Sequence, residues 1–134
     1  MYEAVVSNYL IETKKLLSRR KYDFEKASSH IVPKEPGVYV IHDKHLRGIV
    51  YIGRTRNLKR RLLSDHKHGN VDGSQFRRAL GRKLALKSEG DITNYVLENC
   101  SFQFAVIQDS EEMIRLEHFA TAVLGPILNV QLKY

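Results

Sequence analysis

The chain opens with apolar residues at helical spacing. Between residue 3 and about residue 20 they recur every three to four positions, as expected for an amphipathic helix, at Val5, Val6, Tyr9, Leu10, Leu16 and Leu17. Two prolines, Pro33 and Pro36, follow, and proline ends a helix because it has no amide hydrogen to donate. We therefore predict an N-terminal helical extension over residues 1–32 and a second unit over residues 33–134.

Two short runs of strand-forming residues come after the prolines. Residues 37–42 and 49–53 are rich in valine, isoleucine and tyrosine, which favour extended backbone. The residues between them, 43–48, include three charged side chains and a glycine, a composition typical of a turn. The pattern predicts a β-hairpin over residues 37–53.

The rest of the chain alternates helix signals with one strand signal. Asn57, Ser74 and Ser110 are suited to cap helices because their side chains accept hydrogen bonds from free backbone amides. The expected helices are 58–67, 75–87, 92–99 and 111–124, and the expected strand is 102–107. This order predicts an α/β or α+β fold: a small, mainly antiparallel sheet of about three strands, surrounded by helices.

Positive charge is concentrated in one segment. The formal net charge is +7, and residues 54–87 hold 11 of the 22 Lys and Arg residues but only 2 of the 15 Asp and Glu residues. That segment therefore carries +9, and the rest of the chain −2. A solvated surface is the ordinary explanation of a basic stretch. Its confinement to a quarter of the chain favours contact with a phosphate backbone.

Tyr39 and Tyr51 lie one on each strand of the predicted hairpin. Strand aromatics usually fill a half-buried face of a sheet. Their separation is even, so both rings project from the same face whenever paired positions sum to an even number, and two phenols could share one site. Gly37 and Gly53 adjoin the strands, where glycine either allows close approach of a ligand or backbone or serves as a strand end.

Glu117 interrupts the apolar stripe of the last predicted helix. It falls in the middle of the stripe formed by Met113, Leu116, Ala120, Val123 and Leu124. A carboxylate on a packing face is costly unless it is paired, hydrogen-bonded or bound to a cation. A buried salt bridge, an edge position and a cation site all remain open. By contrast, Glu111 and Glu112 lie in the first turn of the helix, where a negative charge is stabilised by the positive end of the helix dipole.

Composition argues against several classes of protein. The longest apolar run is far too short to cross a bilayer, and residues 1–3 lack the start of a signal peptide. The single cysteine, Cys100, permits neither an internal disulfide nor a cysteine-based zinc site. His66 and His68 are two apart and do not share a helix face as metal ligands. We expect an intracellular protein, in the cytoplasm or nucleoid, with no membrane partner.

Five elements in order resemble the GIY-YIG nuclease superfamily. They span roughly a hundred residues and are Pro-Gly-Val-Tyr at 36–39, Tyr-Ile-Gly at 51–53, Asn57-Leu58 with Arg61, Leu116-Glu117, and Pro-Ile-Leu-Asn at 126–129. Their spacing is similar to the N-terminal nuclease domain of the bacterial excision-repair endonuclease. Each short motif is weak alone, but together they are a specific signal.

The resemblance implies a role for particular residues. Glu117 would be the one protein carboxylate on a single divalent cation, Mg²⁺ or Mn²⁺. Tyr39 and Tyr51 would flank the scissile phosphate, one of them activating or positioning the attacking water. Arg61 would stabilise charge on the phosphoryl oxygens, and Asn129 would hold the site together by hydrogen bonds.

Two positions differ from the excision-repair pattern. Arg54 lies three residues past Tyr51, where the repair enzyme typically has lysine, so a proton role specific to lysine is in doubt. His66 lies five residues past Arg61, close to where some restriction and homing members place a histidine. It is a secondary catalytic candidate.

The expected function is therefore endonuclease cleavage of DNA, branched or structured DNA included, in repair, recombination, restriction or a mobile element. A partner protein or a homodimer could supply specificity. Two alternatives remain open: a DNA-binding module of the same fold with weak or no cleavage, and a basic RNA-binding or ribosome-associated protein. The residues expected to contact DNA are Arg54, Arg56, Lys59, Arg60, Arg77, Arg78, Arg82 and Lys83.

Overall fold

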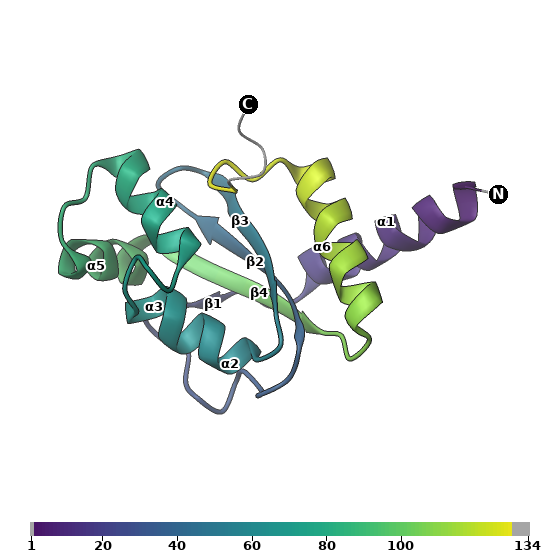
Figure 1. Ribbon diagram of the computed structural model, residues 1–134, viewed down its shortest axis with the longest axis horizontal. Helices are drawn as coiled ribbons and strands as arrows, with labels where there is room; N and C mark the ends of the chain where they lie inside the picture. The colour runs from purple at the N-terminus through teal and green to yellow at the C-terminus, as the bar shows by residue number, and fades with distance from the viewer. Residues whose placement is uncertain (1, 130–134) are drawn as a thin grey trace.

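The computed structural model describes residues 2–129 (Figure 1). In chain order its elements are α1 (Tyr2–Ser18), β1 (Tyr22–Asp23), β2 (Gly37–Asp43), β3 (Gly48–Thr55), α2 (Leu58–Arg60), a π-helical turn (Arg61–Asp65), α3 (His66–His68), α4 (Gln75–Leu84), α5 (Glu89–Asn99), β4 (Cys100–Val106) and α6 (Ser110–Leu124).

The strands form one antiparallel sheet in the order β1-β4-β2-β3. The predicted hairpin is confirmed as β2 and β3. The mixed fold with a small antiparallel sheet is confirmed as well, with one more strand than the three expected. That strand, β1, has two residues, too few to show an alternating pattern in the sequence. Within this sheet, β2 is central and β3 is an edge strand.

Helices cover both faces of the sheet (Figure 1). On one face, the helical run from α2 to α3 packs with α4 and α5 in a cluster that includes Tyr39 and Ile41. On the other face, α1 and α6 pack in a cluster that includes Val38 and Val40. Alternate residues of β2 thus enter opposite layers, as the pleat requires. The central strand is a shared support for both layers.

The N-terminal segment packs into the same body. Leu16 of α1 and Phe24, just after β1, are almost completely buried, and β1 pairs with β4. Residues within the predicted extension therefore contribute to the sheet and to both clusters. The division between residues 32 and 33 stays a prediction.

Side-chain caps determine where the helices begin. Asn57 and Ser74 accept hydrogen bonds from backbone amides three residues on, as predicted. Ser88 caps α5 in the same way, so that helix begins at residue 89 and not at 92. The cap of α6 is Asp109 and not Ser110, because Asp109 has extended backbone and its carboxylate accepts from an amide of the first turn.

Two further details differ from the sequence predictions. Helix α4 ends at Leu84, short of residue 87, because Ala85 adopts left-handed backbone with φ of 54°. On α6, Val123 is 56% exposed although it was assigned to the apolar stripe. It lies in the last turn, at the angular edge of that stripe. Among residues 2–129, no helix combines the length and apolar character needed to cross a bilayer.

Candidate active site

A cavity of about 670 Å³ opens beside the edge strand β3. Both helical layers reach it: the π-helical turn and α4 from one side, and α6 from the other. Five residues to which the resemblance assigns a catalytic role line this cavity, although they are spread over ninety positions of sequence. They are Tyr39, Tyr51, Arg61, Glu117 and Asn129. The secondary candidate, His66, is not among the lining residues.

Tyr39 and Tyr51 project from the same face of the hairpin, as their even spacing predicts. Tyr39 pairs with Gly53 and Tyr51 pairs with Ile41, so the two tyrosines are diagonal neighbours with ring centroids 6.4 Å apart. Burial, and next the neighbouring Tyr51, raises the pKa of the Tyr39 phenol well above its usual value. Burial also raises the pKa of Tyr51. Both phenols therefore carry their protons at neutral pH.

The two motif glycines are both required by close approach. A Cβ atom at Gly53 would overlap the Tyr39 hydroxyl, and a Cβ atom at Gly37 would overlap the carbonyl oxygen of Ala105 on β4. Both glycines are therefore explained by the close approach of a neighbouring group, one of the two roles predicted for them. Gly53 in particular makes room for the hydroxyl of Tyr39.

His66 is fully buried between Tyr39 and Ser74. Its Nε2 atom lies 2.7 Å from Tyr39 Oη, and its Nδ1 atom lies 2.7 Å from Ser74 Oγ. Burial, and next the charges of Arg61 and Arg77, lowers the pKa of His66 to about 3. The ring is therefore neutral, with one nitrogen donating and the other accepting. It links the tyrosine hydroxyl to the cap of α4.

The π-helical turn brings Arg61 and His66 to the same side of their helix. The amide of His66 donates to the carbonyl of Arg61, five residues earlier. In a regular α-helix of 3.6 residues per turn, side chains five apart diverge widely. The wider turn reduces this divergence, and such turns are frequent at functional sites. The sequence predicted an uninterrupted α-helix here, since nothing in its apolar spacing marks the extra residue.

Arg61 faces the cavity with part of its hydrogen-bonding capacity unused. Its side chain is 36% exposed, and its Nε atom lies 3.3 Å from Asp65 Oδ2. That contact lacks hydrogen-bond geometry, so this buried Nε has no hydrogen-bond partner among the described residues. A partly exposed guanidinium at a cavity wall is suited to an anion such as a phosphate oxygen.

Glu117 is buried and ion-paired. It is 6% exposed, and its Oε1 atom accepts a hydrogen bond from Arg54 Nη1 at 2.6 Å. Its Oε2 atom accepts from the Thr121 hydroxyl at 3.3 Å. The interruption of the apolar stripe is therefore a buried salt bridge. Glu117 also lines the cavity, so its position is compatible with a salt bridge and with a cation site.

Asn129 joins the end of the chain to the edge strand. Its Oδ1 atom accepts from the Ile52 amide at 3.0 Å, and its Nδ2 atom donates to the Ile52 carbonyl at 2.7 Å. The side chain thus pairs with β3 as a neighbouring strand would. These two hydrogen bonds hold the backbone beside Gly53 in place.

The cavity has the chemistry for a hydrated divalent cation held by one protein ligand. Within residues 2–129, Glu117 is the one carboxylate that lines the cavity, and no group of three or more His, Cys, Asp or Glu residues that could hold a metal occurs there. Mg²⁺ prefers oxygen ligands and commonly keeps several waters when one or two carboxylates bind it. A volume of about 670 Å³ leaves room for such waters.

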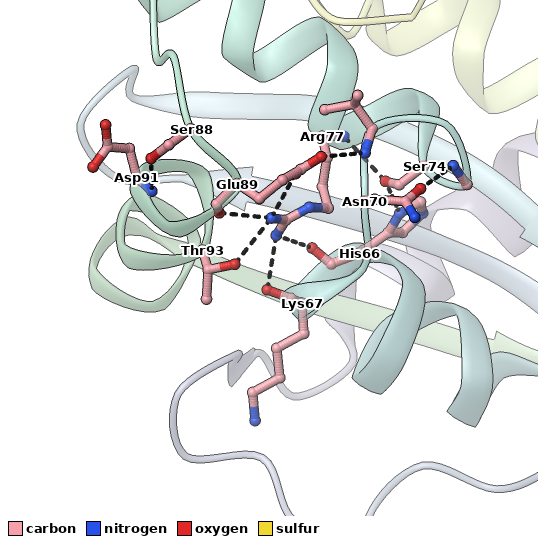
Figure 2. Close-up of polar contacts among 11 residues, drawn as sticks. His66, Lys67, Asn70, Ser74, Arg77, Ser88, Glu89, Asp91 and Thr93 are labelled. Atoms are coloured by element: carbon pink, nitrogen blue, oxygen red, sulfur yellow. Dashed lines mark hydrogen bonds and ion pairs between the residues drawn. The ribbon is translucent and has the colours of Figure 1, made fainter.

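Arg77 does not lie where a DNA contact would require. It is fully buried, and Figure 2 shows its guanidinium enclosed by α3, α4 and α5. Its terminal nitrogens donate to the carbonyls of Lys67 and Glu89 at 3.0 Å each, to Thr93 Oγ1 at 2.9 Å and to the Glu89 carboxylate at 3.2 Å. The prediction was wrong for this residue: Arg77 joins three helices.

The other predicted DNA contacts remain at least partly accessible. Arg54, Arg56, Arg60, Arg82 and Lys83 are exposed, whereas Lys59 and Arg78 are half-buried. A second hollow of about 460 Å³ contains Arg56, Arg60 and Arg61, so it shares Arg61 with the main cavity. Positive charge therefore continues outward from the candidate site along one of its sides.

Two members of the site were missed by sequence reasoning. Ser74 was assigned only a capping role, yet its hydroxyl also bonds His66. Gln75 was given no role, yet its Oε1 atom accepts from the Tyr51 hydroxyl at 3.0 Å. Both adjoin the start of α4. The sequence signal that could have found them was Ser74. A capping residue marks where a helix begins, and it therefore places itself and Gln75 at that end of α4.

The chain belongs to the GIY-YIG family. The family model of the GIY-YIG catalytic domain matches residues 7–134, which is nearly the whole chain and extends into α1. The resemblance read from residues 36–129 is confirmed, and with it the class of enzyme.

Its relatives include the UvrABC system protein C of Dictyoglomus thermophilum, 28% identical over 102 residues, which are 75% of this chain and 14% of that protein. Two solved structures of the GIY-YIG N-terminal endonuclease domain of UvrC from Thermotoga maritima are also similar. A point mutant bound to its catalytic divalent cation is 22% identical with a TM-score of 0.46, and the magnesium-bound domain is 24% identical with a TM-score of 0.44. Each match covers 76% of this chain and 91% of that domain.

Proposed function

We propose that this protein is an endonuclease that hydrolyses DNA phosphodiester bonds with one divalent cation. The observation that carries the proposal is the convergence of two tyrosines, one arginine and a single buried carboxylate on one cavity. Exposed arginines and lysines continue from that cavity, as contact with a phosphate backbone requires.

Each side chain has a distinct task toward the phosphate. Arg61, whose side chain is partly exposed at the cavity wall, would bind a phosphoryl oxygen through its guanidinium, and Tyr51 would position the phosphate from the same face. Glu117 would hold the cation, Mg²⁺ or Mn²⁺. When bound, that ion supplies Lewis acidity toward the phosphate and its leaving oxygen.

Of the two tyrosines, Tyr39 is better placed to accept the proton of the attacking water. Its hydroxyl faces a ring nitrogen of His66, which accepts the tyrosine proton in the tautomer that donates from Nδ1 to Ser74. That hydrogen bond makes the Tyr39 oxygen more basic. The Tyr51 hydroxyl donates to the amide oxygen of Gln75, a far weaker base. We therefore assign general-base assistance to Tyr39: as its oxygen takes the water proton, its own hydroxyl proton would pass to Nε2 of the neutral His66 ring.

Cleavage assays with a matched pair of variants test the proposal. The protein is incubated with supercoiled plasmid and with branched or flapped duplexes, with and without Mg²⁺. Cleavage that requires Mg²⁺, is lost in Glu117→Ala and persists in Glu112→Ala supports it, because Glu112 is an exposed carboxylate of the same helix. Equal cleavage by Glu117→Ala, or DNA binding without cleavage on every substrate, would exclude it.

A further inference from the structure

The most unusual contact of the site is the one between Arg54 and Glu117. The carboxylate that would hold the cation already accepts a charge-assisted hydrogen bond of 2.6 Å from a guanidinium. The side chain of Glu117 is 7% exposed, whereas that of Arg54 is 38% exposed. One partner of the pair is thus fixed within the fold and the other has access to solvent.

A cation and Arg54 compete for the same carboxylate. Among residues 2–129 no other carboxylate lines the cavity, and one oxygen of Glu117 is bonded to Arg54 while the other is bonded to Thr121. A divalent ion beside a guanidinium on one carboxyl group also experiences direct repulsion, which is strong where burial lowers the dielectric constant. The ion pair therefore opposes cation binding as long as Arg54 stays in place.

Arg54 has a second anion within reach if DNA occupies the cavity. It lines the main cavity together with Arg61, and it also lines an adjacent hollow of about 250 Å³ with Arg56 at the N-terminal end of α6. Its long side chain can leave Glu117 without movement of β3, and a guanidinium binds carboxylate and phosphate oxygens with the same planar donor geometry.

We propose that Arg54 exchanges partners, holding Glu117 when the site is empty and a DNA phosphate when it is occupied, so that DNA binding releases the carboxylate for the cation. This inference rests on the proposed function, because it needs both ligands in one cavity. It predicts that DNA and cation strengthen each other's binding, and by the same factor. The protein would then hold its cation tightly only on DNA.

Direct measurement of Mn²⁺ binding in the absence of DNA, by the paramagnetic resonance signal of the free ion, tests the first half. Arg54→Gln should bind Mn²⁺ about tenfold more tightly than the wild type. Arg56→Gln removes an exposed charge two residues away and should stay within about twofold, since bulk screening weakens distant charges. Equal affinities of Arg54→Gln and wild type, or weaker binding by the variant, would overturn the inference.

The second half is tested from the side of DNA, with Ca²⁺ in place of Mg²⁺ and the duplex checked for cleavage. Fluorescence anisotropy of a labelled duplex should show about fivefold tighter binding by the wild type when Ca²⁺ is added. Arg56→Gln should keep this ratio despite weaker binding overall, and Arg54→Gln should lose it. A ratio of one in the wild type, or an unchanged ratio in Arg54→Gln, contradicts exchange.

Two further variants separate the possible failures. Glu117→Gln should abolish Mn²⁺ binding; if it does not, the cation does not bind Glu117 and the proposed function itself fails. Arg54→Lys keeps the charge but has a single cationic nitrogen, so its Mn²⁺ affinity should lie between wild type and Arg54→Gln. Thermal unfolding confirms that each variant is folded, and Arg54→Lys carries the test if Arg54→Gln is not.

Discussion

The cavity has two sides that differ in how their polar groups are used. The tyrosine side consists of Tyr39 at the cavity wall with His66 and Ser74 behind it, all buried and joined by hydrogen bonds of 2.7 Å. The charged side consists of Arg54, Arg61 and Glu117, where each arginine side chain is more than a third exposed. The polar groups of the tyrosine side have few alternative hydrogen-bond partners, whereas those of the charged side have several.

The difference separates positioning from exchange. A buried neutral chain of hydrogen bonds has one favourable arrangement, because every broken bond leaves a polar group without water. Half-exposed charges lose less when they change partner, since solvent and incoming ions replace what is lost. We infer that the tyrosine side is preformed and that the charged side rearranges when ligands bind. The three predictions that follow perturb the support of the first side.

The largest expected effect comes from Arg77, which lies beneath the tyrosine side. Arg77→Met should lower the free energy of unfolding by about 3 kcal/mol, because it removes the hydrogen bonds that the buried guanidinium donates to the Lys67 and Glu89 carbonyls and to Thr93 Oγ1. Arg78→Met, one residue further and half-buried, should leave stability nearly unchanged. It should weaken DNA binding and reduce its salt dependence by about one phosphate contact.

Urea unfolding and DNA titrations at several salt concentrations measure the two arginine variants. If both variants lost stability equally, or if Arg77→Met changed only DNA affinity, the assignment of Arg77 to the core would be wrong.

His66 makes stability depend on pH. Its pKa falls from 6.5 to about 3 in the folded protein, so below pH 6.5 the unfolded chain binds a proton that the folded chain does not. The contribution is complete above pH 6.5 and is lost as pH falls, at about 1.4 kcal/mol per pH unit. At pH 5 the wild type should have lost about 2 kcal/mol relative to His66→Gln, each compared with its own stability at pH 7.5.

The control for this pH dependence is His68→Gln, which removes an exposed histidine of the same short helix. Identical slopes for His66→Gln and wild type would show that His66 is not held neutral in the folded state.

The smallest expected effect distinguishes two serine caps, both drawn in Figure 2. Ser74 caps α4 and Ser88 caps α5, each by accepting from a backbone amide. Replacement by alanine should cost about 1 kcal/mol of stability in either case. Only Ser74→Ala should also slow cleavage, by about tenfold, because only Ser74 supports His66. Equal cleavage rates in the two variants would remove Ser74 from the site.

Much of this protein follows from local sequence. The hairpin, the shared face of Tyr39 and Tyr51 and the caps at Asn57 and Ser74 were all correctly predicted, because each depends on neighbours close along the chain. Predictions were wrong where the sequence signal was too short, or where it was the same for two neighbouring residues. The two residues of β1 show no periodicity, and Arg77 is indistinguishable from Arg78 by composition.

The sequence alone determined which residues could do chemistry, since a carboxylate in an apolar stripe and paired strand tyrosines are unfavourable without a reason. Only the tertiary structure decided what those residues touch. The π-helical turn joined the backbones of Arg61 and His66, the hydroxyl of Ser74 reached the ring of His66, and α6 brought Glu117 against Arg54. Each of these contacts joins separate turns or elements, so its geometry depends on packing and not on the spacing of residues along the chain.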